Sequence, residues 1–207
     1  MIKQMDNVER YAPPEGYYEN THNRDPSAYL IEAIKLIKPS AKTALDFGCG
    51  AGSETKLLLN EEFAVIAVDG NKEAEEYIKK LPHQDRVAFV CSSFEEFDFK
   101  NYDLVNSSRS LPFIDKSVFG NVMSQLLNSI NQNGVFVGEF YGVNDEWNKP
   151  GETMTFLSRS EIERLFKGMT IIKLKESEED GHIANGKAKH WHRFYVVAQK
   201  VSNLQGA

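Results

Sequence analysis

The sequence predicts a doubly wound α/β domain, in which helices cover both faces of a mostly parallel sheet. Short apolar runs alternate with helical segments from residue 43 onward. The run from Phe63 to Val68 is apolar without polar alternation, which is typical of a parallel strand covered on both faces. Strict alternation of strand and helix implies right-handed crossovers, and ligands in such sheets bind beyond the carboxyl ends of the strands.

The individual elements follow from local patterns. Asp25 and Pro26 predict the start of a first helix, as its N-cap and first residue, and Pro39 predicts its end. Ser158 and Glu161 fit a capping box before a later helix. The acidic run 176–180 is interpreted as a solvated loop, with attraction for a cationic molecule as the alternative. The expected strands are 43–47, 63–68, 87–91, 102–106, 134–141, 169–175 and 193–200.

Composition limits the class of protein. The chain has 207 residues, enough for one domain, and its net charge of −6 argues against a nucleic-acid-binding surface. Cys49 and Cys91 fall in apolar strand regions and are interpreted as buried, reduced thiols. The first residues contain no apolar signal segment and no run is long enough to span a membrane, so we expect a cytoplasmic protein.

A glycine-rich turn follows the first strand. Gly48, Gly50 and Gly52 let the backbone turn sharply and approach a ligand, and the next helix points free N–H groups to the same place. Asp69 closes the second strand, where a carboxylate can accept hydrogen bonds from two ribose hydroxyls. The simpler alternative is a tight turn plus a surface acid. Together the two features predict a site for a nucleoside-type cofactor.

The spacing of the glycines distinguishes between cofactors. A dinucleotide fingerprint needs its third glycine three residues after the second, whereas Gly52 comes two residues after Gly50. Asp46, just before the turn, would oppose a pyrophosphate but suits a ligand carrying an ammonium or sulfonium group.

These residues resemble the class I S-adenosylmethionine-dependent methyltransferases, whose first motif is an acid followed by Gly-x-Gly-x-Gly. The resemblance covers about residues 40 to 200. It implies a three-layer Rossmann-like sheet of seven strands, the last antiparallel and placed between the fifth and sixth. More closely, the chain is similar to small bacterial methyltransferases of the tellurite-resistance type. The phrases carrying that likeness are Gly16-Tyr17-Tyr18, Leu111-Pro112-Phe113, Glu139-Phe140-Tyr141-Gly142 and Lys189-His190-Trp191-His192.

The resemblance also implies roles for positions around the cofactor. Gly48 and Gly50 would line its methionine part, and Asp69 would hold the ribose with Gly70 beside it. Ser93 stands where the family often has an acid near the adenine amino group. The remaining cofactor positions are Asp46, the backbone N–H of Phe94, and Asn106 and Ser107 near the sulfonium.

The segment 1–40 is expected to be an arm and helix that cover the cofactor, with 41–207 forming the methyltransferase domain. In related enzymes this segment folds over the cofactor. The faces of Tyr17 and Tyr18 could attract a sulfonium, and Arg24 could bind the methionine carboxylate. The alternative is a loosely packed arm.

An antiparallel last strand would begin at the ligand edge, near the end of the fifth strand. His190 and His192 would face one way and Trp191 the other, and the two histidines are candidate catalytic bases. Their alternative role is to support a loop, and a zinc site with His182 is disfavoured, so no metal is expected. The candidate acceptor wall consists of Phe113, Tyr141 and Trp147, which could equally be lid packing.

The predicted function is transfer of a methyl group from S-adenosylmethionine to a small molecule by in-line displacement, leaving S-adenosylhomocysteine. Such a reaction depends mainly on positioning and exclusion of water. We expect no nucleic-acid or membrane partner, and a monomer or homodimer. The alternatives are a non-catalytic module that binds S-adenosylmethionine and, less favoured by the glycine spacing, a nicotinamide-dependent oxidoreductase.

Overall fold

The computed structural model describes residues 13, 15–38, 42–183 and 186–201. Its strands are β1 Thr43–Phe47, β2 Ala64–Asp69, β3 Val87–Cys91, β4 Tyr102–Ser107, β5 Ile130–Gly142, β6 Phe156–Leu157, β7 Thr170–His182 and β8 Ala188–Gln199. Its α-helices are α1 Tyr17–Thr21, α2 Ala28–Ile34, α3 Ser53–Asn60, α4 Ala74–Ile78, α5 Phe119–Asn128 and α6 Arg159–Leu165.

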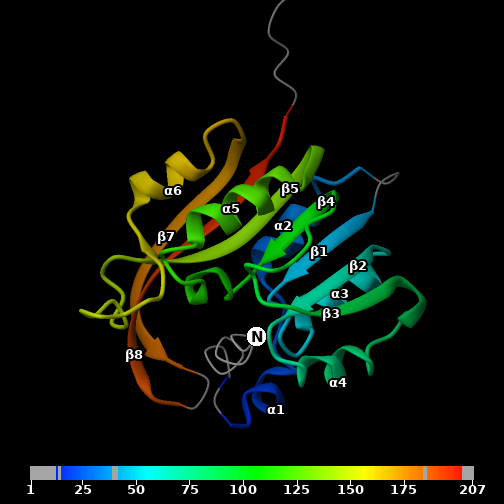
Figure 1. Cartoon of the computed structure of the whole chain (residues 1–207), viewed down its shortest axis with the longest axis horizontal. Coiled ribbons are helices and arrows are strands. Elements are labelled where there is room, and N and C mark those ends of the chain that lie inside the picture. Colours follow the sequence, from blue (N-terminus) through cyan, green and yellow to red (C-terminus); the bar gives the residue numbers. More distant parts are fainter. Residues whose placement is uncertain (1–12, 14, 39–41, 184–185, 202–207) are drawn as a thin grey trace, which may run out of the picture.

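The sheet has the strand order β3-β2-β1-β4-β5-β8-β7, and the two-residue strand β6 pairs alongside β5 (Figure 1). Strands β1 to β5 run parallel to one another, whereas β8 is antiparallel to both β5 and β7. The predicted fold class is therefore confirmed, including the antiparallel last strand between the fifth and sixth strands of the main series.

Two apolar layers cover the sheet. Helices α5 and α6 bury residues such as Leu126 and Ile162 against one face, together with Phe136 of β5. Helices α2 and α3 bury Leu30 and Leu58 against the other face. Burial of these side chains is the main force that holds the helices to the sheet. Among the described residues, no helix is both long and apolar enough to cross a lipid bilayer.

Helix boundaries agree with the sequence where a local signal decides them. Ser158 caps α6: its side chain accepts a hydrogen bond from the Glu161 N–H, and its own backbone N–H donates to the Glu161 carboxylate, as the predicted capping box requires. The start of α2 was predicted wrongly, because its N-cap is Ser27 and not Asp25. Pro39, the predicted end of that helix, lies outside the described residues, and α2 already ends at Ile34.

The acidic run 176–180 was also predicted wrongly, because it is part of strand β7. Glu176, Glu178 and Asp180 pair with Phe194, His192 and His190 of β8. The neighbouring strand supplies the backbone partners, and basic side chains on β8 offset the acidic charge, as in the 2.8 Å ion pair between Arg193 and Glu179. The hairpin of β7 and β8 consequently extends beyond the other strands, toward the side of the molecule that carries α1 (Figure 1).

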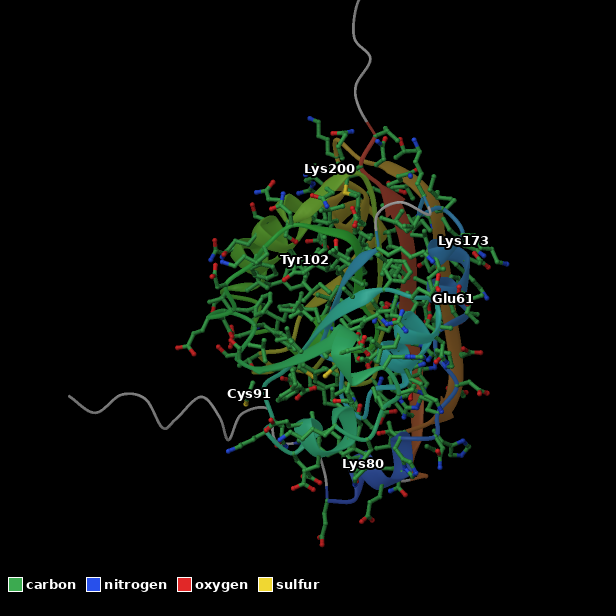
Figure 2. The ribbon with its side chains drawn as sticks, turned by 90° about the vertical axis from the view of Figure 1, so that its right-hand side faces the viewer. Glu61, Lys80, Cys91, Tyr102, Lys173 and Lys200 are labelled. Atoms are coloured by element: carbon green, nitrogen blue, oxygen red, sulfur yellow. The ribbon has the colours of Figure 1, made fainter. Side chains whose placement is uncertain are left out.

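The cysteines differ in environment. Cys49 is buried in the glycine turn, as predicted. Cys91 ends the edge strand β3 and is exposed, which corrects the expectation of a buried thiol; Figure 2 shows its side chain at the periphery of the molecule.

Candidate functional site

The glycine turn lies at the carboxyl end of β1. Gly48, Gly50 and Gly52 have φ angles of 84°, 51° and 83°, in the left-handed region that disfavours residues with a side chain. The backbone N–H groups of Gly48 and Cys49 both donate to the carbonyl oxygen of Val68, at 2.8 Å. The turn is thereby attached to the end of β2, and α3 begins at Ser53 immediately after it.

Asp69 connects the end of β2 to this turn. One carboxylate oxygen accepts a hydrogen bond from the Gly50 N–H, and the other accepts one from the Asn71 N–H, both at 2.9 Å. Burial raises the pKa of Asp69, and the two N–H donors partly oppose that rise. The carboxylate is thus fixed in orientation at the ligand edge of the sheet.

A cavity of about 410 Å³ opens between the glycine turn, the segment after β4 and the loop after β5. Nine residues predicted for the site line it: Tyr17, Tyr18, Gly48, Gly50, Asp69, Gly70, Ser93, Phe94 and Phe113. Residues not predicted also line it: Pro13, Arg109, Ser110, Asp115, Glu152, Thr153 and Met154. Ser93 is notable because its hydroxyl oxygen is buried without a hydrogen-bond partner among the described residues.

A second cavity of about 30 Å³ adjoins the first and shares Tyr17, Gly48, Gly50 and Arg109 with it. Arg24 lines this smaller cavity. The structure therefore brings the predicted Arg24 to the glycine turn, beside Arg109.

Arg109 was missed by the sequence reasoning. Its φ angle is 63°, an uncommon conformation for a residue with a side chain, and its guanidinium lies 3.2 Å from a Glu54 carboxylate oxygen. The sequence around it, Ser108-Arg109-Ser110, has no motif that would have identified it. Its strained backbone and its place in both cavities became visible with the tertiary structure.

Asp46 and Asn106 are not among the described residues that line either cavity, and their contact with the cofactor stays a prediction. Both are buried and bond to each other, with the Asn106 amide donating to Asp46 at 2.7 Å. The Thr55 hydroxyl donates to the other Asp46 oxygen at 2.5 Å. Asp46 and Asn106 therefore stabilise the base of the glycine turn from within the protein interior. Burial and the nearby Glu54 raise the pKa of Asp46 to about 7, against the opposing effect of these hydrogen bonds.

Asp46→Asn is expected to raise stability near pH 8 and to flatten its pH dependence. With a folded-state pKa of about 7, the folded protein retains a proton that the unfolded chain releases above roughly pH 4. The contribution of Asp46 to stability is thus complete at low pH and is lost as the pH rises through the folded-state value. The amide oxygen can still accept from Asn106, and the amide NH2 can donate to the Thr55 hydroxyl, which then accepts, so both contacts are kept without the charge. Urea unfolding at several pH values measures this, and parallel pH profiles of variant and wild type would contradict it.

Ser107 is also used internally. Its hydroxyl donates to the carbonyl oxygen of Phe47 at 3.1 Å and lies 2.7 Å from the hydroxyl of Ser110. Ser110, and not Ser107, lines the cavity in the described structure. The predicted place of Ser107 near the sulfonium stays a prediction.

The two histidines lie on the hairpin, and neither is among the described residues that line the cavities. His192 is buried, with Nδ1 3.1 Å from the Asn144 N–H nitrogen and Nε2 3.0 Å from Glu176. Because Nδ1 accepts from Asn144, Nε2 carries the proton and donates to Glu176. Both ring nitrogens are thereby engaged in hydrogen bonds, and the catalytic role of His192 stays a prediction.

His190 is more exposed and faces the same acidic strand. Its Nδ1 lies 2.7 Å from Asp180 and its Nε2 3.3 Å from Glu178. Hydrogen bonds to these two carboxylates raise its pKa. Trp191 faces the opposite way, as the strand alternation predicts. Among the described residues, no cluster of three or more His, Cys, Asp or Glu could hold a metal ion.

Of the three aromatic residues predicted to form the acceptor wall, only one is among the described residues that line the cavity. Phe113 lines the cavity, whereas Tyr141 and Trp147 lie behind it, with ring centroids 6.2 Å and 6.4 Å from that of Phe113. The side chain of Lys189 is buried between Tyr141, Trp147 and Trp191. No sequence signal indicated that this lysine is buried.

The comparison with known proteins agrees with the glycine turn, with Asp69 and with the strand order of the sheet. Residues 44–134 match the family described as a methyltransferase domain, and these residues contain the glycine turn and Asp69. Over these residues the chain is therefore similar to a methyltransferase domain.

The proteins to which this chain is similar differ widely from it in sequence. The malonyl-acyl-carrier protein O-methyltransferase of Acetivibrio thermocellus is 28% identical over 139 residues, which are 66% of this chain and 46% of that protein. The chain therefore spans about half the length of this curated relative.

Two solved structures illustrate the shared fold. TehB from Haemophilus influenzae has a TM-score of 0.74 and 16% identity, over 90% of this chain and 66% of that chain. This match confirms, for the fold, the resemblance to the tellurite-resistance type. The 1,6-didemethyltoxoflavin-N1-methyltransferase of Burkholderia thailandensis, solved with bound 1,6-didemethyltoxoflavin and S-adenosylhomocysteine, has a TM-score of 0.66 and 18% identity over 94% of this chain and 88% of that chain.

Proposed function

We propose that this protein transfers a methyl group from S-adenosylmethionine to a small-molecule acceptor. The observation that carries the proposal is the cavity of about 410 Å³ that the glycine turn, the fixed Asp69 carboxylate and the Ser93 hydroxyl, unpartnered among the described residues, line together. A buried polar atom without a partner costs free energy, so its place at the cavity favours a ligand that completes its hydrogen bonding.

The residues present fit this cofactor. Asp69 would accept hydrogen bonds from the ribose, and Ser93 would bond to the adenine. Arg24 and Arg109 lie where they could bind the methionine carboxylate, and Tyr17 and Tyr18 form the aromatic side of the cavity. S-adenosylmethionine supplies an activated methyl group on a sulfonium. The chain's own contribution is to hold the reactants in line and to exclude water.

The size of the cavity favours a small acceptor. A cavity of about 410 Å³ is at the low end for ligand pockets, so cofactor and acceptor must share a confined space. The methyltransferase of Burkholderia thailandensis, similar in fold, was solved with the small molecule 1,6-didemethyltoxoflavin. The net charge of −6 gives no support to a nucleic-acid acceptor. The state of assembly, monomer or homodimer, and the division into a covering segment and a main domain stay predictions.

Calorimetry tests the proposal. We expect S-adenosylhomocysteine and S-adenosylmethionine to bind, and NAD not to bind, because the glycine spacing disfavours a pyrophosphate. A preference for NAD would overturn the proposal. Binding of S-adenosylmethionine without turnover on a panel of small acceptors would favour the non-catalytic alternative.

The histidines are tested separately. From their positions we expect His190→Ala and His192→Ala to bind S-adenosylhomocysteine normally, and His192→Ala to lose stability because Asn144 and Glu176 lose a partner. Thermal unfolding and calorimetry measure both properties. Loss of turnover in His190→Ala, with cofactor affinity unchanged, would restore the catalytic role predicted from the sequence.

A further inference from the structure

A buried cation lies inside an aromatic cage at the start of β8. The Nζ atom of Lys189 is 3.5 Å from the ring centroid of Trp191, 4.2 Å from that of Trp147 and 5.0 Å from that of Tyr141. These three rings are called the cage below. The Lys189 side chain is 1% exposed. Such rings attract a cation through their negative faces, and more strongly where water is excluded.

The charge of Lys189 is matched by an equally buried acid. Both carboxylate oxygens of Asp145 lie close to Nζ, at 2.5 Å and 2.6 Å, and the Asp145 side chain is 0% exposed. Asp145 also accepts hydrogen bonds from the backbone N–H groups of Trp147 and His192. It therefore joins the loop after β5 to the beginning of β8.

That loop reaches the ligand cavity. Its residues Glu152, Thr153 and Met154 line the cavity. Further along, the Thr155 N–H donates to the carbonyl oxygen of Pro112 at 2.9 Å, and the Thr155 hydroxyl donates to that of Ile114 at 2.8 Å. The loop is thus bound at one end to the Lys189–Asp145 pair and at the other to the segment that contains Phe113.

Phe113 connects the cage with the cavity directly. It lines the cavity on one side, and on the other its ring contacts Tyr141 and Trp147 of the cage. A buried ion pair is a poor source of stability compared with apolar packing, because both charges lose their hydration. The pair does, however, fix the relative positions of the groups that it bonds. A loop that forms part of a cavity wall needs such fixed contacts.

We propose that Lys189 and Asp145 are positioning residues, which hold Phe113 and the 152–154 segment in place as the cavity wall opposite Asp69. The pair acts through the cage and the loop, since neither residue is among the described residues that line the cavity. The inference rests on the proposed function, because S-adenosylhomocysteine is the ligand that reports the state of the wall.

The test removes both charges together. Lys189→Met with Asp145→Asn leaves no lone buried charge, so the double variant is expected to fold. We expect its affinity for S-adenosylhomocysteine to fall about tenfold, with a thermal midpoint close to that of the wild type. The matched control is Lys100→Met with Asp98→Asn, which removes an exposed pair just before β4 and should leave affinity unchanged.

The tryptophans supply an independent signal. The chain contains two, and both belong to the cage. Saturating S-adenosylhomocysteine should therefore change the tryptophan emission of the wild type, and the change should be lost in the double variant. Unchanged affinity in the double variant would overturn the inference, and so would a wild-type emission that does not respond to bound ligand, even if the variant fails to fold. Absence of binding to the wild type would instead overturn the proposed function.

Discussion

Asp69→Ala is expected to weaken binding of S-adenosylhomocysteine by about 100-fold, while the protein stays folded. A carboxylate fixed by two backbone N–H groups can accept hydrogen bonds from two ribose hydroxyls without reorganising. Hydrogen bonds to a charged group contribute about 1.5–3 kcal/mol each, so losing them costs at least two powers of ten in affinity. The fold is retained because removing the carboxylate also removes the cost of burying it, which partly offsets the two lost backbone hydrogen bonds.

Calorimetry gives the affinity, and the thermal midpoint shows whether the variant is folded. The matched control is Glu73→Ala, which removes an exposed acid at the start of α4, four residues after Asp69. Its affinity should equal that of the wild type. An affinity for Asp69→Ala within a factor of two or so of wild type would show that the ribose is not held at the end of β2.

Gly48→Ala is expected to reduce both stability and ligand binding strongly. A Cβ atom at this position would lie 2.2 Å from the Cβ of Ser110 and 2.7 Å from its hydroxyl oxygen, and the φ angle of 84° disfavours any side chain. The left-handed backbone costs about 1–2 kcal/mol and the overpacking a further 1–3 kcal/mol. Relief of the clash would move Ser110, which lines the cavity, so cofactor affinity should fall as well.

Two further variants separate the causes. Gly50→Ala has a comparable backbone conformation, with φ of 51°, but its Cβ would meet nothing nearer than the Tyr17 ring at 3.8 Å. It should therefore show the backbone cost alone. Adding Ser110→Gly to Gly48→Ala removes the clashing atoms and should recover the difference. Urea unfolding measures each step, and equal losses for Gly48→Ala and Gly50→Ala would show that Ser110 yields easily.

Much of the fold could be predicted because its signals are local. The apolar run of β2 and the capping box at Ser158 depend on residues adjacent in sequence, and both predictions are confirmed within one or two residues. The acidic run of β7 shows the opposite case. Its charges indicated a loop, but the run pairs with β8 and is a strand. Arg193 on β8 offsets part of the acidic charge, and a partner on another strand cannot be read from the run itself.

The candidate site divides in the same way. By itself the sequence determined the glycine turn, Asp69 and the class of cofactor, because glycine spacing and the distance to the next strand end are properties of the chain order. The tertiary structure alone decided which polar groups face the cavity. Asp46 and Ser107 are turned inward by partners on other elements, Thr55 and Phe47, whereas Arg109 faces the cavity. Burial and charge pairing depend on atoms distant in sequence, and these interactions also placed Lys189 inside its cage.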